Sequence, residues 1–214
     1  LMRRSVELAR EAAGADRVVA ASVGPYGAML GNGAEYTGDY DKDEDQLVEF
    51  HVPRIEALAE AEPDVLAVET IPSFVEARAL VRALEKVPEI PAWVSFSCRD
   101  GRHICDGTPI GSAVELVASA PGVVAVGVNC TSPLFVERLV ETISDTTGKH
   151  IVCYPNRGSF WDPMRKTWTD PPRQDARPPL RPLAWKEAGA SLIGGCCGTT
   201  PDDTAAAARA LGRT

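Results

Sequence analysis

The 214-residue sequence has no long hydrophobic run, no dense stretch of lysine and arginine, and only six cysteines. No apolar stretch approaches the length of about 20 residues that a membrane-spanning helix needs. The formal net charge of −8 argues against a nucleic-acid surface and against docking on anionic lipid. Six cysteines in a chain this long are too sparse for a disulfide scaffold, so we expect a reducing, cytoplasmic location.

The composition is that of an ordinary globular protein, with 44% hydrophobic and 24% charged residues. No linker divides the chain, so we expect one domain over residues 1–214. The first ten residues are amphipathic and charged, unlike a signal peptide. Because they resemble the middle of a helix, we expect the chain to be a fragment of a longer protein.

Six short apolar segments alternate with segments of helical periodicity. This strict alternation predicts a parallel sheet with helices packed outside, and strands that are apolar on both faces. The expected strands are 17–23, 64–70, 92–98, 123–128, 150–154 and 191–193. The expected helices are 45–61, 73–84, 109–119, 132–143, 183–188 and 200–211.

Local signals mark several of these boundaries. Pro53 predicts a kink or a break in the helix 45–61. Ser73 with Glu76 predicts a capping box at the start of the next helix. Thr200, with a proline and an aspartate after it, predicts the start of the last helix. Residues 28–43 and 157–182 are expected to form loops, the first of them longer than a simple connection needs.

Three cysteines follow predicted strands. Cys130 comes just after the strand 123–128, and Cys196 and Cys197 stand in a Gly-Gly-Cys-Cys-Gly stretch after the last strand. Because the carboxyl ends of parallel strands share one edge of a sheet, these cysteines can converge. Three thiolates without a fourth protein ligand indicate an open zinc site. The alternative is three cysteines that pack at the same edge by chance.

Other residues at this edge leave two interpretations open. Glu69 closes an apolar strand, and it either binds a substrate ammonium group or forms a salt bridge with a neighbouring Arg or Lys. Trp161 and Trp168 either cover the site or fasten their own loop. The remaining cysteines and the histidines are expected to be structural or to lie at the surface. They are Cys98, Cys105, Cys153, His51, His103 and His150. Among them, Cys98 and His103 are placed where they can approach the site.

Motifs along the whole chain together resemble the homocysteine S-methyltransferase family. They are Ser-Val-Gly-Pro-Tyr-Gly at 22–27, Glu-Thr at 69–70, Asp-Gly-Thr-Pro at 106–109, Gly-Val-Asn-Cys at 127–130, Tyr-Pro-Asn at 154–156 and Gly-Gly-Cys-Cys-Gly at 194–198. The resemblance is greatest to the short members that use S-methylmethionine. It implies an α/β fold of the (β/α)8 TIM barrel type, of which this chain resembles units 3 to 8 with the first two βα units absent.

The resemblance also implies a chemistry. Zinc would be held by Cys130, Cys196 and Cys197, and L-homocysteine would bind it through sulfur. The homocysteine thiolate would take a methyl group from S-methylmethionine or S-adenosylmethionine, giving methionine, with zinc activation of the thiol as the only catalytic device. Glu69 would hold the homocysteine amino group, and Asn129 is the second candidate substrate-binding residue.

Two alternatives accompany this expectation. One is a methyltransferase for selenocysteine or another thiol, which the same zinc chemistry would serve. The other is a catalytically inactive zinc-binding fragment, because no Asp-Gly loop that grips homocysteine precedes Arg17.

Overall fold

The structure is a computed structural model that describes residues 1–158, 160–162, 164–169 and 178–213. Its helices are α1 (Met2–Ala13), α2 (Tyr26–Leu30), the 3-10 helix η1 (Ala34–Tyr36), α3 (Glu44–Ala59), α4 (Phe74–Leu84), α5 (Ile110–Ala118), α6 (Pro133–Thr146), α7 (Pro182–Glu187) and α8 (Pro201–Ala210). Its strands are β1 (Ala20–Val23), β2 (Val65–Ile71), β3 (Ala92–Phe96), β4 (Val123–Asn129), β5 (His150–Tyr154), β6 (Phe160–Asp162), β7 (Thr167–Thr169) and β8 (Leu192–Ile193).

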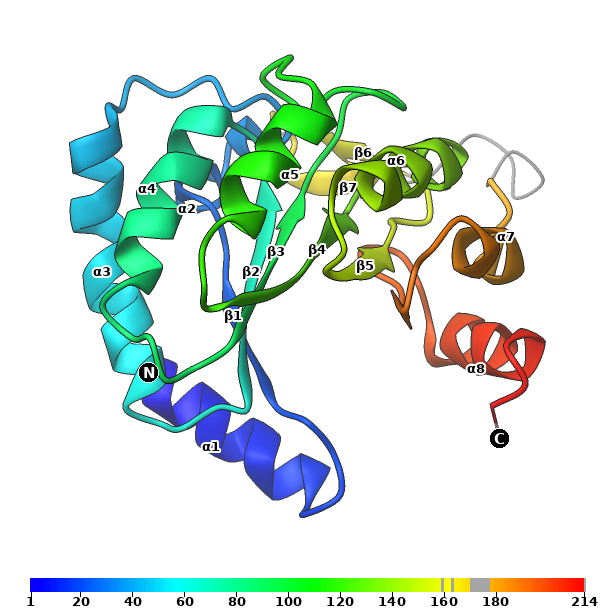
Figure 1. Ribbon diagram of the computed structural model, residues 1–214, viewed down its shortest axis with the longest axis horizontal. Helices are drawn as coiled ribbons and strands as arrows, with labels where there is room; N and C mark the ends of the chain where they lie inside the picture. Colours follow the sequence, from blue (N-terminus) through cyan, green and yellow to red (C-terminus); the bar gives the residue numbers. More distant parts are fainter. Residues whose placement is uncertain (159, 163, 170–177, 214) are drawn as a thin grey trace.

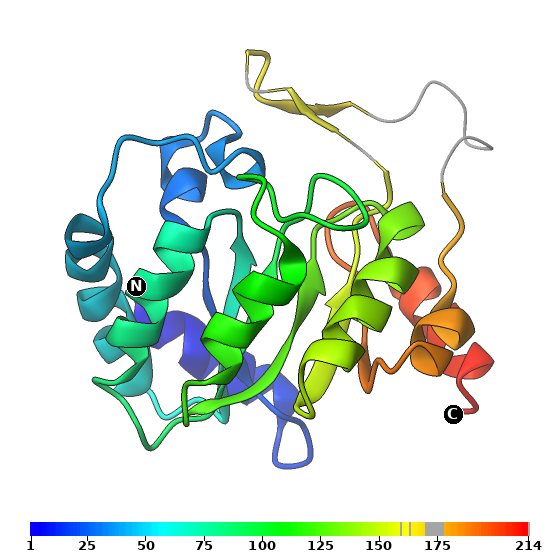
Figure 2. The same cartoon turned by 45° about the horizontal axis from the view of Figure 1, so that its top comes forward.

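Six strands form one parallel sheet in the order β1-β2-β3-β4-β5-β8, which confirms the predicted architecture. The helices α3, α4, α5 and α6 lie along one side of this sheet (Figure 1). The antiparallel hairpin of β6 and β7 projects from the end of the molecule where the strands finish (Figure 2). Within the described residues, no helix is both long and apolar enough to cross a membrane.

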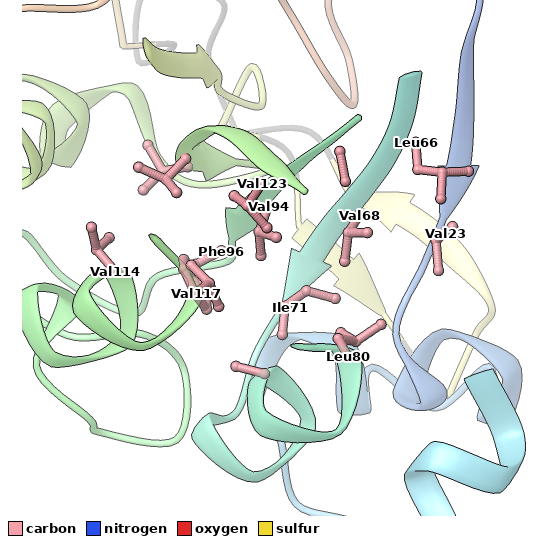
Figure 3. Close-up of a cluster of buried hydrophobic side chains, with 14 of the residues drawn as sticks. Val23, Leu66, Val68, Ile71, Leu80, Val94, Phe96, Val114, Val117 and Val123 are labelled. Carbon is pink, nitrogen blue, oxygen red and sulfur yellow. The ribbon is translucent and has the colours of Figure 1, made fainter. Parts of the chain in front are cut away.

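The hydrophobic core lies between the sheet and its helices. Leu66 and Val68 of β2 belong to one buried hydrophobic cluster with Leu80 of α4 and Val114 of α5 (Figure 3). All four side chains have 0% exposure. Burying side chains of this size contributes about 1.5–3 kcal/mol each, so this layer fixes the strands that carry the site.

The opposite face of the sheet is polar near the strand ends, so the prediction that the strands are apolar on both faces is wrong there. Ser22, Glu69 and Tyr154 come from three different strands and are joined by hydrogen bonds across this face. Successive side chains of a strand point to opposite faces, so one set can pack on the helices while the other stays available to a ligand.

Two local predictions are refined by the structure. Helix α3 runs through Pro53 without a break, so of the two predicted outcomes only the kink stays a prediction. Leu47, Ile55 and Leu58, on both sides of the proline, are buried. Residues 28–43 are not a plain loop, since they contain the end of α2 and the whole of η1.

The predicted cap of α4 is half right. Ser73 accepts a hydrogen bond from the Glu76 backbone N–H at 3.3 Å, as expected. The Glu76 carboxylate does not complete the capping box, because it is fully buried and accepts hydrogen bonds from the Tyr26 backbone and the His51 ring instead.

Candidate metal centre

Three cysteine sulfurs meet where β4 and β8 end. The Sγ atoms of Cys130, Cys196 and Cys197 all lie within 4.8 Å of one another. Cys130 Sγ is 3.4 Å from Cys197 Sγ, and Cys196 Sγ is 3.9 Å from Cys197 Sγ. Thiolates bound tetrahedrally at about 2.3 Å from zinc would stand about 3.8 Å apart. The spacing of the three sulfurs therefore fits a single metal ion.

Hydrogen bonds couple the three sulfurs. Hydrogen bonds from Cys130 and Cys196 lower the pKa of Cys197 to about 3. The hydrogen bonds of Cys130 with Cys196 and Cys197, together with burial, raise the pKa of the Cys130 thiol. A bound cation would stabilise the deprotonated form of all three thiols.

The segment that follows β5 ties the two cysteine-bearing segments together. The Cys196 backbone N–H donates to the Pro155 carbonyl at 2.9 Å. The Asn156 side chain donates from Nδ2 to the Cys130 carbonyl at 3.2 Å. Because β5 lies between β4 and β8 in the sheet, its end is placed to hold both sides of the cluster. The sequence marked 154–156 as a strand end and as one of the family motifs, without a role for Asn156. That role follows from its contacts.

The turn that carries Cys196 and Cys197 depends on glycine. A Cβ atom on Gly195 would lie 2.5 Å from the Thr199 side-chain oxygen, which itself donates to the Cys196 carbonyl at 2.6 Å. Directly afterwards Thr200 and Asp203 form a capping box at the start of α8, as predicted. The tight turn and the capped helix fix the direction in which the cysteine pair points.

Tyr36 also reaches the cluster, although the sequence gave no direct sign of it. Its hydroxyl oxygen lies 3.1 Å from Cys130 Sγ. Burial and the nearby Cys130 raise the pKa of the Tyr36 phenol well above its usual value, so it keeps its proton. The only signal in the sequence was the length of the loop that contains it.

Glu69 lies on the polar face of the sheet between two hydroxyl groups. Ser22 Oγ donates to one carboxylate oxygen at 2.6 Å, and Tyr154 Oη donates to the other at 2.9 Å. Trp93 Nε1 donates to the same Tyr154 oxygen at 3.0 Å. Among the described residues, no Lys or Arg comes within salt-bridge distance of Glu69, so the proposed local salt bridge is not formed there. The two hydroxyl donors therefore orient the Glu69 carboxylate.

Asn129, the second predicted substrate residue, is only 1% exposed. Its Oδ1 accepts hydrogen bonds from the Thr70 backbone N–H at 2.7 Å and from Ser95 Oγ at 2.8 Å. Its Nδ2 donates to Thr70 Oγ1 at 2.7 Å. The carboxamide is therefore engaged with the residue that follows Glu69.

The other cysteines lie outside the three-sulfur cluster and are buried, including Cys98. Burial raises the pKa of Cys105 to about 11 and that of Cys153 to about 12. These thiols are structural at neutral pH.

The predicted histidine and tryptophan roles have different outcomes. His51 is fully buried, and the His103 ring is bonded to Asp100 at 3.0 Å. The backbones of Trp161 and Trp168 pair in the hairpin of β6 and β7. Their side chains lie outside the described part of the structure, so a tryptophan cover remains a prediction.

Comparison with known proteins gives a consistent result. The family model for homocysteine S-methyltransferase matches residues 1–211. The homocysteine S-methyltransferase YbgG of Bacillus subtilis is 46% identical over 197 residues, which are 91% of this chain and 62% of the relative. The selenocysteine Se-methyltransferase of Brassica oleracea var. italica is 40% identical, over 94% of this chain and 64% of the relative.

A solved structure agrees with these relatives. The metallated form of the homocysteine methyltransferase MmuM from Escherichia coli superposes with a TM-score of 0.81 at 40% identity, over 98% of this chain and 69% of that chain. This chain spans a little under two thirds of the length of two of these relatives, YbgG and the selenocysteine Se-methyltransferase. The match over nearly all of its own residues shows that the chain belongs to the homocysteine S-methyltransferase family.

Proposed function

We propose that this chain transfers a methyl group from a sulfonium donor to the thiol of L-homocysteine, at a zinc ion held by Cys130, Cys196 and Cys197. The observation that carries the proposal is the cluster of three sulfurs, 3.4 Å and 3.9 Å apart for the pairs that include Cys197. The similar structure of MmuM in a metallated form supports metal binding by this fold. S-Methylmethionine is the first candidate donor and S-adenosylmethionine the second.

The residues of the chain divide the work of binding. Glu69, oriented by Ser22 and Tyr154, would hold the substrate ammonium group through charge-assisted hydrogen bonds. Asn129 would act on substrate binding by holding Thr70, next to Glu69, in place. Zinc, when bound to the three thiolates, supplies a lowered pKa for a substrate thiol that still remains nucleophilic.

The reaction balances without any other reagent. The homocysteine thiol loses its proton to solvent, and its sulfur forms a bond to the methyl carbon. The bond between that carbon and the donor sulfonium breaks, and its electron pair stays on the donor sulfur. With S-methylmethionine both products are methionine.

We further propose that the six parallel strands are equivalent to units 3 to 8 of a (β/α)8 barrel, within one homocysteine-binding domain over residues 1–214. The open sheet order, with β1 and β8 at its two edges, supports this equivalence. All six cysteines are free, which supports a reducing, cytoplasmic setting.

The second candidate function is methyl transfer to selenocysteine. A relative named selenocysteine Se-methyltransferase, 40% identical to this chain, favours keeping it. A selenol would meet the same carboxylate and the same cysteine cluster. A chain that holds zinc without turnover is the third reading, and the experiment below separates it from the first two.

The test begins with metal content per chain, measured on protein purified under reducing conditions. About one zinc per chain is expected, and Cys130→Ser should lose it because one of three ligands is removed. The control, Cys105→Ser, should keep the metal, since Cys105 lies outside the cluster and contacts Ser97 instead. A Cys130→Ser variant with unchanged zinc would contradict the assignment.

Methyl transfer is then measured with S-methylmethionine and either homocysteine or selenocysteine. The acceptor is followed in each case, because the donor leaves methionine in both reactions. Faster loss of homocysteine supports the first function, and faster methylselenocysteine formation supports the second. A chain that retains zinc and methylates neither acceptor would be the inactive metal-binding form.

A further inference from the structure

The contact between Tyr36 and Cys130 joins two segments that are 94 residues apart in the sequence. Tyr36 is the last residue of η1, in the connection between α2 and α3. The phenol oxygen is 3.1 Å from Cys130 Sγ, within hydrogen-bond distance for sulfur. The residue therefore touches a candidate metal ligand from a part of the chain that supplies none.

The connection between α2 and α3 is held in place on both sides of Tyr36. On the N-terminal side of Tyr36, the Tyr26 backbone N–H donates a hydrogen bond at 2.6 Å to the fully buried Glu76 carboxylate. On the C-terminal side, the Tyr40 hydroxyl donates to the same carboxylate. Ser97 Oγ donates to the Glu35 carbonyl at 2.9 Å, one residue before Tyr36.

A buried carboxylate with several donors forms a rigid unit, because any partner that left would expose an uncompensated charge. Tyr36 is consequently presented to Cys130 by a fixed backbone. The hydrogen bonds on both sides of Tyr36 therefore fix the backbone from which its side chain reaches Cys130.

We propose that Tyr36 is a positioning residue that donates a hydrogen bond from its phenol to the metal-bound thiolate of Cys130. The proposal rests on the metal site proposed above. A thiolate that binds a metal has no proton, so the phenol must be the donor in this contact. The bond would hold Cys130 Sγ in direction and withdraw electron density from it, as partners of metal ligands generally do.

The test compares Tyr36→Phe with Tyr26→Phe in the full 214-residue chain. The first variant keeps the ring and removes the hydroxyl beside Cys130. The second removes a hydroxyl from the adjoining helix α2, where the Tyr26 ring packs against Phe50 with centroids 5.0 Å apart. Each protein is titrated with Co²⁺, which reports thiolate coordination through its sulfur-to-metal charge-transfer absorption, and zinc affinity is measured by competition with a chelator.

Tyr36→Phe should bind the metal about 10-fold or more weakly. Its charge-transfer band should move to longer wavelength, because a thiolate without the donor gives up electron density more easily. Tyr26→Phe should match the unaltered chain in both. A Tyr36→Phe variant with the same affinity and the same band would overturn the proposal. X-ray absorption that shows one oxygen ligand fewer in this variant would overturn it too, since Tyr36 would then be a ligand.

The outcomes also separate this inference from the proposed function. A chain that gives no cobalt–thiolate absorption defeats the metal site and the inference with it. A chain that binds cobalt normally while Tyr36→Phe has no effect defeats the inference alone. If Tyr36→Phe does not fold, Ser97→Ala replaces it, because that change removes the bond at the Glu35 carbonyl; a smaller loss of affinity in the same direction is expected, and none would overturn the proposal.

Discussion

The side chain of Asn129 and the residue Thr70 are joined by two reciprocal hydrogen bonds, both 2.7 Å long. Thr70 has a φ of 64°, a left-handed conformation that is an outlier for a β-branched residue. Such a conformation persists only where its surroundings enforce it. Asn129, the residue before Cys130, thus fixes the backbone directly after Glu69 and links the carboxylate to the sulfur cluster.

We expect Asn129→Ala to lower the free energy of unfolding by about 2–3 kcal/mol, because it leaves the Thr70 N–H unpaired. The same change should matter less in a Thr70→Gly background, where glycine adopts the positive φ without support. Urea unfolding of the two single variants and the double variant measures the coupling, expected to exceed about 0.5 kcal/mol. Strictly additive effects would show that Asn129 does not act through Thr70.

Glu69→Gln should weaken homocysteine binding to the zinc-loaded chain at least about 10-fold, since a charge-assisted hydrogen bond contributes about 1.5–3 kcal/mol. Zinc content should stay the same, because Glu69 is bonded to Ser22 and Tyr154 and not to the cysteines. Titration calorimetry with homocysteine measures the change. The control is Glu115→Gln on the exposed surface of α5; equal affinities for the two variants would make Glu69 structural.

Asn156→Asp should lower zinc affinity about 10-fold. The aspartate keeps the oxygen that accepts the Gly158 N–H at 3.0 Å, but it has no amide to donate to the Cys130 carbonyl. The added negative charge would by itself attract a cation, so a fall in affinity isolates the lost hydrogen bond. Chelator competition gives the measurement, and an unchanged or higher affinity would count against the role of Asn156.

The buried thiol of Cys153 should make stability fall at high pH. Burial raises its pKa from 9.0 to about 12. Between these values the unfolded chain loses the proton and the folded chain keeps it, so this group's contribution is complete below pH 9 and is lost as the pH rises toward 12. The slope for one such group is about −1.4 kcal/mol per pH unit.

Urea unfolding of the reduced protein at pH 8, 9 and 10 tests this dependence. Cys153→Ala should be less stable at pH 8 because of the cavity, yet its stability should decline less steeply above pH 9. Parallel declines for the two proteins would mean that Cys153 does not titrate differently in the folded and unfolded states.

The sequence by itself determined the order of the elements and the chemistry of the cluster. The apolar periods of the strands and helices are local, so all six sheet strands could be predicted with small shifts at their ends, and the strand 150–154 without any. The alternation of strands and helices placed the ends of β4 and β8 at one edge of the sheet. This placement predicted that Cys130 would meet Cys196 and Cys197.

Only the tertiary structure decided what surrounds the cluster. Tyr36 contacts Cys130 across 94 residues, and Glu76 leaves its predicted cap to hold Tyr26 and Tyr40. No local pattern in the sequence marks Tyr36 as a partner of Cys130, or Glu76 as a partner of the two other tyrosines. Such contacts arise from the way distant segments pack once the sheet has formed. Local patterns in the sequence specify the helices and strands, and residue type specifies the candidate metal ligands. The hydrogen bonds that orient those ligands depend on the complete fold.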